Sequence, residues 1–179
     1  MRQFKKQLWV LSVAAVAFCL SAPSAHAASA SSSFPVNAAV AATCTISTAN
    51  LNFGNYDPIL ANATTPLVMD GSVTVTCTKG SQVWIDLDAG THAASAVGTT
   101  RAMLLSGVGP DALSYELFSD AGLTTVWGLG DPTAGGNGFA PGPAVNKNGR
   151  TFPIHGRVPA AQDSAVGNYT DSVQATVNF

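Results

Sequence analysis

The feature that most constrains the fold is a series of short segments in which apolar residues occupy every second position. The most regular one closes the chain, where residues 169–179 alternate from Tyr169 to Phe179. Segments 72–77, 83–89 and 113–120 have the same period. A period of two places the apolar side chains on one face of an extended strand, and several such strands separated by turn residues predict an all-β sandwich.

The segments between these strands are predicted with less regular structure. Residues 125–128 are expected to form a short strand, and residues 130–148, rich in Gly, Pro and Asn, a long exposed loop. In segment 83–89 the alternation places Asp86 and Asp88 on the solvent face, opposite Ile85 and Leu87.

The first 27 residues predict a secretory signal peptide. Arg2, Lys5 and Lys6 precede the apolar run 8–20, and a small-residue cleavage site follows, with cleavage expected after Ala27. The run is shorter than the roughly 20 residues of a membrane span. We therefore expect an exported protein.

Cleavage would leave 152 residues with five Lys and Arg against ten Asp and Glu, a net charge of about −5. This balance leaves no basic patch for nucleic acid. The charged content of 10% is well below the roughly 25% of ordinary soluble domains. Such a composition fits one domain of an exported surface or assembly protein.

Two cysteines, Cys44 and Cys77, remain after cleavage, and an even pair in an oxidising compartment predicts a disulfide. The disulfide would close a loop of 33 residues. Closing a loop of that size contributes roughly 3 to 4 kcal/mol to the free energy of unfolding in the chain-entropy model. Neither the spacing nor a nearby histidine supports a redox or metal pair.

The segment ahead of Cys44 has the pattern of a strand without a known partner. Phe34, Val36, Ala38 and Val40 fall on alternate positions and would share one face. Such a strand exposes an apolar row and unpaired backbone groups unless a sheet receives it. Periodicity alone leaves open whether that sheet belongs to the same domain or to another copy.

Catalytic and metal-binding patterns are missing from the sequence. His92 follows a glycine turn, His155 lies in an expected strand, and no serine is framed by a nucleophile-elbow pattern. Asp86 and Asp88 are expected to be solvated rather than paired acids, and the acidic residues lack calcium-site spacing. We expect no enzyme activity, no cofactor and no metal.

Several pieces occur in a characteristic order across nearly the whole exported chain: Thr43-Cys44-Thr45-Ile46, Leu51-Asn52-Phe53-Gly54, Val73-Thr74-Val75-Thr76-Cys77, Leu113-Ser114-Tyr115-Glu116-Leu117, Gly156-Arg157-Val158-Pro159-Ala160, and Gly167-Asn168-Tyr169-Thr170-Asp171 before the final alternation. In this order and spacing they resemble the spore coat protein U family. Members of that family in Gram-negative bacteria resemble pilins of the archaic chaperone-usher pathway.

The resemblance implies an incomplete immunoglobulin-like β-sandwich that lacks its final strand and is completed by a donor strand from another subunit. It assigns residues 1–27 to the signal, 28–43 to a donor extension and 44–179 to the sandwich. Phe34, Val36, Ala38 and Val40 match the donor position. The implied partners are other copies or related pilins, a periplasmic chaperone and an outer-membrane usher. Export would run through the periplasm to a surface pilus or to the medium.

Two functions remain open at this point. One is a structural pilin subunit that polymerises by donor-strand complementation and serves adhesion or biofilm formation. The other is a self-contained secreted coat or surface-binding protein that does not polymerise and presents loop 130–148. An adhesive tip subunit would be expected to carry a further binding domain, for which 152 residues leave little room.

Overall fold

The computed structural model describes residues 28–95, 98, 100–106 and 110–179. The signal peptide expected at residues 1–27 lies outside this part. The chain divides into two compact units, one ending at Ala38 and the other running from Ala39 to Phe179. The described residues up to Thr43 form no strand, and all of them are exposed.

The described residues of the second unit form strands, two single turns of 3₁₀ helix and the loops that connect them. The strands are β1 (Cys44–Ala49), β2 (Leu67–Cys77), β3 (Trp84–Leu87), β4 (Arg101–Leu105), β5 (Ala112–Phe118), β6 (Arg150–Val158), β7 (Tyr169–Thr170) and β8 (Ala175–Asn178), with turns η1 (Ala93–Ser95) and η2 (Pro132–Ala134). No α-helix occurs in the described part of the chain. The predicted all-β class is confirmed.

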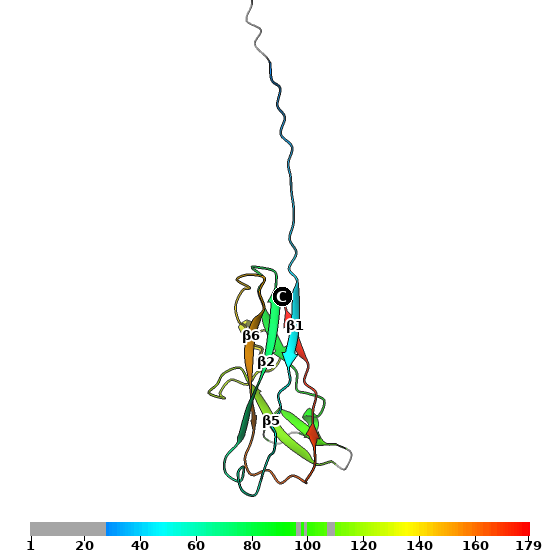
Figure 1. Cartoon of the computed structure of the whole chain (residues 1–179), viewed down its shortest axis with the longest axis vertical. Helices are drawn as coiled ribbons and strands as arrows, with labels where there is room; N and C mark the ends of the chain where they lie inside the picture. Colours follow the sequence, from blue (N-terminus) through cyan, green and yellow to red (C-terminus); the bar gives the residue numbers. More distant parts are fainter. Residues whose placement is uncertain (1–27, 96–97, 99, 107–109) are drawn as a thin grey trace, which may run out of the picture. The chain divides into compact units, whose positions relative to one another are not determined.

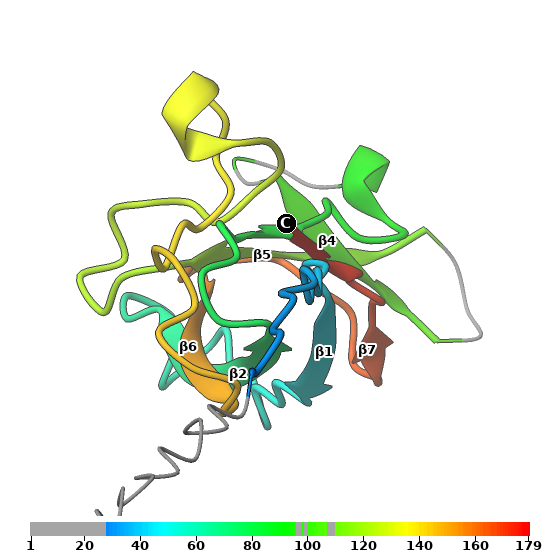
Figure 2. The ribbon, with the colours of Figure 1, turned by 90° about the horizontal axis from the view of Figure 1, so that it is seen from above.

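Six strands form one antiparallel sheet in the order β1-β2-β6-β5-β4-β7, and β3 pairs with β8 in a second, two-stranded sheet. Figure 1 shows the long strands β2 and β6 side by side. Seen from above in Figure 2, the six-stranded sheet curls, so that its two edge strands, β1 and β7, lie on the same side of the domain.

The core follows the alternation of the sequence. Val73, Val75 and Cys77 of β2 are at most 4% exposed, whereas the hydroxyl residues between them are only partly buried. Strand β5 is buried on both faces, since each residue from Leu113 to Phe118 is buried. Trp127 is 1% exposed, and its Nε1 donates to the carbonyl of Ile85 at 2.8 Å.

The closing segment differs from the single strand that its alternation predicts. The chain leaves the large sheet after β7, crosses residues 171–174 and joins the small sheet as β8. The two faces nevertheless persist, since the odd-numbered residues from Tyr169 to Val177 are partly buried and the even-numbered ones up to Thr176 are exposed.

Two further expectations are wrong. Residues 125–128 form no strand, because only an isolated bridge joins Val126 to Phe118. Segment 130–148 is not an exposed loop throughout: Ala144 is 3% exposed, and Phe139 bridges Ile85 and packs its ring against Trp127. The glycines and prolines of this segment predict a loop, but its residue Phe139 pairs with the edge of β3 and Ala144 is buried.

Candidate functional site

The domain contains a groove of about 1140 Å³ between two of its chain segments. One wall is residues 48–58, which continue from edge strand β1, and the other is residues 164–175, which include edge strand β7 and the crossing to β8. Side chains from β4, β5 and β6 line the space between the walls. The apolar lining consists of Ala49, Leu51, Phe53, Tyr56, Pro58, Leu87, Met103, Leu113, Tyr115, Leu117, Ile154, Ala165, Val166, Tyr169, Val173 and Ala175.

The walls of this groove are less buried than its floor. Leu113 and Leu117 are 6% and 5% exposed, whereas Leu51, Tyr169 and Val173 of the walls pack against the core but remain only partly buried. Both walls adjoin edge strands that pair with a single neighbour among the named strands. The groove is therefore where one more strand could join the sandwich.

A glycine lets one wall pack down onto the sheet. A Cβ at Gly156 of β6 would lie 2.8 Å from side-chain carbons of both Leu51 and Phe53, well inside van der Waals contact. Phe53 in turn meets the ring of Tyr115 edge-on at 5.9 Å between centroids. These contacts fix residues 51–53 as a firm wall.

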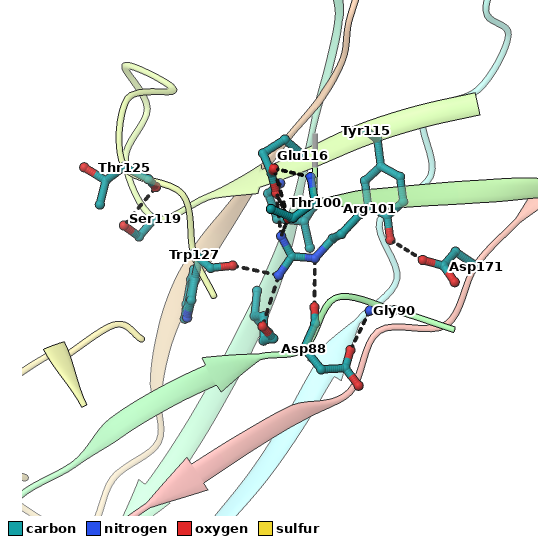
Figure 3. Close-up of polar contacts among 12 residues, drawn as sticks. Asp88, Gly90, Thr100, Arg101, Tyr115, Glu116, Ser119, Thr125, Trp127 and Asp171 are labelled. Carbon is teal, nitrogen blue, oxygen red and sulfur yellow. Dashed lines mark hydrogen bonds and ion pairs between the residues drawn. The ribbon is translucent and has the colours of Figure 1, made fainter. Parts of the chain in front are cut away.

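The opposite wall is fastened by Asp171, whose side chain is 2% exposed. Its Oδ1 accepts from the backbone N–H of Thr91 at 3.0 Å and the hydroxyl of Thr91 at 2.7 Å, and lies 3.0 Å from Nδ1 of His92. Its Oδ2 accepts from the hydroxyl of Tyr115 at 2.7 Å (Figure 3). One carboxylate thus ties the β7–β8 crossing to the segment after β3 and to β5.

The electrostatics of this cluster favour the ionised carboxylate. Burial by itself would raise the pKa of Asp171, but hydrogen bonds from Thr91 and Tyr115 hold that pKa below its usual value. Burial, and then the bond to Asp171, raises the pKa of the Tyr115 hydroxyl. Nδ1 of His92 also lies 3.1 Å from the hydroxyl of Thr91, so the same ring nitrogen faces both the hydroxyl and the carboxylate. In a catalytic relay one ring nitrogen faces the hydroxyl and the other faces the carboxylate, so this arrangement is a structural clasp.

A second buried polar cluster centres on Arg101 of β4, which is 1% exposed. Its Nη1 lies 2.6 Å from Oε1 of Glu116, its Nε donates to the carbonyl of Asp88, and its Nη2 donates to the carbonyls of Leu87 and Trp127 (Figure 3). Since β4 and β5 belong to the large sheet and Leu87 to the small one, this guanidinium joins the two sheets.

The structure corrects the expectation that Asp86 and Asp88 are solvated. Both are partly buried: Asp86 accepts from the N–H of Gly130 and the amide of Asn178, and Asp88 accepts from the N–H groups of Gly90 and Gln174. They hold loops beside β3 and β8. His155 lies 2.7 Å from Asp70, its register partner on the neighbouring strand.

The residues that precede β1 are attached to the domain where β1 begins, at Thr43 and Cys44. A disulfide joins Cys44 and Cys77, which are register partners on β1 and β2, and the N–H of Thr78 donates to the carbonyl of Thr43 at 2.9 Å. Phe34, Val36 and Val40 are 80%, 83% and 83% exposed, and Ala38 is also exposed.

Sequence reasoning did not single out Asp171 and Arg101. Each lies in an alternating or mostly apolar segment, and a charged residue at a core-facing position was the available signal. Their partners come from distant segments, which periodicity cannot reveal. In the described part of the chain no group of three or more His, Cys, Asp or Glu side chains is placed to hold a metal ion, and no helix is long and apolar enough to cross a membrane.

The fold is a β-sandwich with a groove between two segments that adjoin its edge strands. The sequence profile described as the Spore Coat Protein U domain matches residues 30–176, and the chain belongs to that family. Protein U of Myxococcus xanthus is 33% identical over 182 residues, spanning 95% of this chain and 96% of that protein.

A solved structure shares the fold at lower sequence identity. It is the crystal structure of the CsuC-CsuE chaperone-tip adhesion subunit pre-assembly complex from the archaic chaperone-usher Csu pili of Acinetobacter baumannii. The match has a TM-score of 0.52 and 21% identity, and it covers 78% of this chain and 40% of the matched chain. This chain therefore has the fold of an archaic pilus subunit, the class that the sequence resemblance implied.

Proposed function

We propose that the protein is a structural, non-enzymatic subunit of a chaperone-usher type surface fibre, in which residues 34–40 of one copy fill the groove of the next. In this proposal residues 1–27 direct export, residues 28–43 are the donor extension and residues 44–179 are the acceptor sandwich. The fibre would serve adhesion or biofilm formation, and assembly would require a periplasmic chaperone and an outer-membrane usher.

The observation that carries the proposal is the groove between two edge segments, whose floor includes the buried apolar residues Leu113 and Leu117. The same chain has an exposed arm, residues 28–43, in which apolar residues alternate. Seven extended residues span about 20 Å and present four side chains to one face. Phe34, Val36 and Val40 are exposed in the free chain. Burying each of the larger side chains would contribute roughly 1.5 to 3 kcal/mol, and backbone hydrogen bonds to the wall would align the strand.

The test mixes the purified exported domain with a synthetic peptide of residues 28–43 and measures thermal unfolding. We expect the peptide to raise the melting temperature by several degrees, since a ligand that binds only the folded state stabilises it. A peptide with Val36→Asp should lose this effect. The matched control is Asn37→Asp, which adds the same charge on the opposite face of the strand and should retain it.

The second candidate is a self-contained coat protein that does not polymerise, which the description of the matching family as a spore coat domain favours. It predicts no change in melting temperature with any of the three peptides and a domain that stays monomeric without a chaperone. That result would overturn the donor-strand proposal.

A further inference from the structure

The strand registers define two opposite ends of the domain. At the arm pole, comprising residues 39–43, 78–81, 143–149 and Phe179, β1 begins and β2 ends. At the far pole, comprising residues 57–65, 110–111 and 159–168, β2 begins and β6 ends. Figure 1 shows the C-terminus beside the start of β1, at the arm pole.

Backbone hydrogen bonds hold the loops of each pole together. At the arm pole, the N–H of Gly80 donates to the carbonyl of Ala144, and the N–H of Ala144 donates to the carbonyl of Ser81. At the far pole, the N–H of Ala161 donates to the carbonyl of Asn62. Each pole is therefore a defined surface made of several segments.

The far pole presents two large aliphatic side chains on a fixed turn. Ile59 and Leu60 are 79% and 78% exposed. Their N–H groups both donate to Oδ1 of Asp57 at 3.0 Å, and Asn62 closes the turn through its N–H to the carbonyl of Asp57 at 2.7 Å. Val166 is fully exposed at the same pole. A turn held this firmly displays its apolar side chains in one arrangement, as a contact surface does.

The two poles are complementary in character. The arm pole also exposes apolar side chains, with Val145 at 69% and Phe179 at 55%. Both lysines of the described residues, Lys79 and Lys147, are exposed there. The far pole instead exposes the acidic residues Asp111 and Asp163. Apolar groups would thus meet apolar groups, and opposite charges would flank them.

The next step rests on the proposed function. If Val40 occupies the groove of another copy, only residues 41–43 separate it from Cys44, which the disulfide ties to β2. Four Cα steps span at most about 14 Å. The donor domain must then lie directly against the recipient, with its arm pole toward it.

The direction of the donor strand decides which pole of the recipient is touched. Strand β8 runs toward the arm pole, because Asn178 pairs with Trp84 at the start of β3 and Ala175 with Leu87 at its end. A donor parallel to β8 would bring the donor domain to the arm pole of the recipient, where the recipient's own arm leaves. An antiparallel donor keeps that exit clear and ends at the far pole.

We propose that consecutive copies make a second contact, in which the Ile59–Leu60 turn of one copy packs against Val145 and Phe179 of the next. Asp111 and Asp163 face Lys79 and Lys147 across this joint. The contact fixes the angle between subunits, whereas the donor strand alone would leave that angle to residues 41–43, which Thr78 holds through the carbonyls of Ala41 and Thr43.

The test uses fibres isolated from the surface of cells that export the full chain, treated with a zero-length carbodiimide, which joins only amines and carboxylates in contact. We expect mass spectrometry to find cross-links from Lys79 or Lys147 to Asp111 or Asp163 of another copy. Electron microscopy should show a narrow distribution of angles between subunits. The Ile59→Ser/Leu60→Ser double variant should still form polymers, seen as a ladder of bands on a gel, because the donor strand is unchanged. It should lose these cross-links at least fivefold and broaden the angle distribution.

The matched control is Leu129→Ser, which removes an exposed leucine beside β3 and not at either pole. It should change neither measurement. Reversal of both lysines to Glu should weaken cross-linking of the joint, and reversal of Asp111 and Asp163 to Lys in the same chain should restore it. If the variants form polymers with unchanged cross-links and angles, the contact between poles is wrong, whereas the proposal that the subunits polymerise through a donor strand is retained. Failure of the wild-type chain to form a ladder would overturn both.

Discussion

At the scale of single residues, Asp171 is the side chain through which separate parts of the chain hold one wall of the groove. It accepts four close contacts, from Thr91, His92 and Tyr115. Gly90, at φ +77°, turns the chain beside it, and a Cβ there would collide with the carboxylate. The wall is thus positioned by polar bonds and a glycine, and not by apolar packing alone.

We predict that Asp171→Asn destabilises the domain by about 1 to 3 kcal/mol at neutral pH, because the polar groups of Thr91, His92 and Tyr115 lose a charged partner. The pKa of Asp171 is lowered in the folded state. Its contribution is therefore present above the unfolded-state pKa of about 4 and is lost as the pH falls through the lower folded value.

The measurement is urea unfolding of wild type and variant at about pH 7 and about pH 2.5, where the difference between the two proteins should shrink at the acidic pH. Asp163→Asn, an exposed carboxylate at the far pole, is the control and should cost less than about 0.5 kcal/mol. A difference between wild type and Asp171→Asn that does not depend on pH would contradict the assigned role of the charge.

Arg101 holds the two sheets together, as Asp171 holds one wall of the groove in place. We predict that Arg101→Ala costs about 3 to 5 kcal/mol, since it leaves the carboxylate of Glu116 buried without its cation and removes the donor to three carbonyls. Urea unfolding measures this loss. Arg157→Ala, which removes a guanidinium stacked on Phe118, should cost about 1 kcal/mol or less. Equal effects of the two substitutions would argue against the network.

At the scale of secondary structure, period-two alternation was sufficient to predict the core-facing residues of strands that pair on both sides within the large sheet, such as β2 and β5. It indicated the core face of β2 and the buried row of Leu113, Tyr115 and Leu117 on β5. It could not show that residues 169–179 change sheets, because the same faces persist through the crossing at 171–174. The alternation also did not predict that segment 130–148 contributes to the core. This segment is rich in glycine and proline, but Ala144 lies in the core and Phe139 packs against it.

The site was predictable only in part for the same reason. The alternation of the arm and the even cysteine pair are local signals that a sequence displays. The groove is made by segments 48–58 and 164–175, which are far apart in the chain and meet only because the sheet curls. The clasp at Asp171 likewise depends on contacts across 56 and 80 residues.

Strand β1 connects the arm to the domain, and its anchor is the disulfide to β2. We predict that Cys44→Ser/Cys77→Ser destabilises the domain by about 3 to 4 kcal/mol, because the cross-link closes a loop of 33 residues. Urea unfolding with and without a reducing agent measures the effect. The reductant should destabilise the wild type to a similar extent and leave the double variant unchanged; a response of the double variant to reductant would point to another cause.

At the scale of the whole molecule, the sandwich has its two edge strands turned toward one unfilled groove. Edge strands and partly buried apolar walls favour association with another strand. The strand that fills the groove need not come from another copy if the topology lets the chain supply it. Strand β8 ends at the arm pole, and Phe179 is four residues beyond Ala175 of the groove lining. A short linker could therefore return the chain to that end of the groove, where an antiparallel donor would begin.

We therefore predict that residues 34–42 fused after Phe179 through a four-residue flexible linker yield a stable monomer that does not polymerise. With an effective concentration in the millimolar range and a micromolar affinity, the gain is about 4 kcal/mol, a rise of roughly 8 to 16 °C in melting temperature. Calorimetry and size-exclusion chromatography measure both properties. The same fusion with Val36→Asp is the control and should gain nothing. Only an antiparallel donor is compatible with so short a linker, so a fusion that stabilises only with a linker long enough to span the domain would reverse the assigned direction and, with it, the contact between poles.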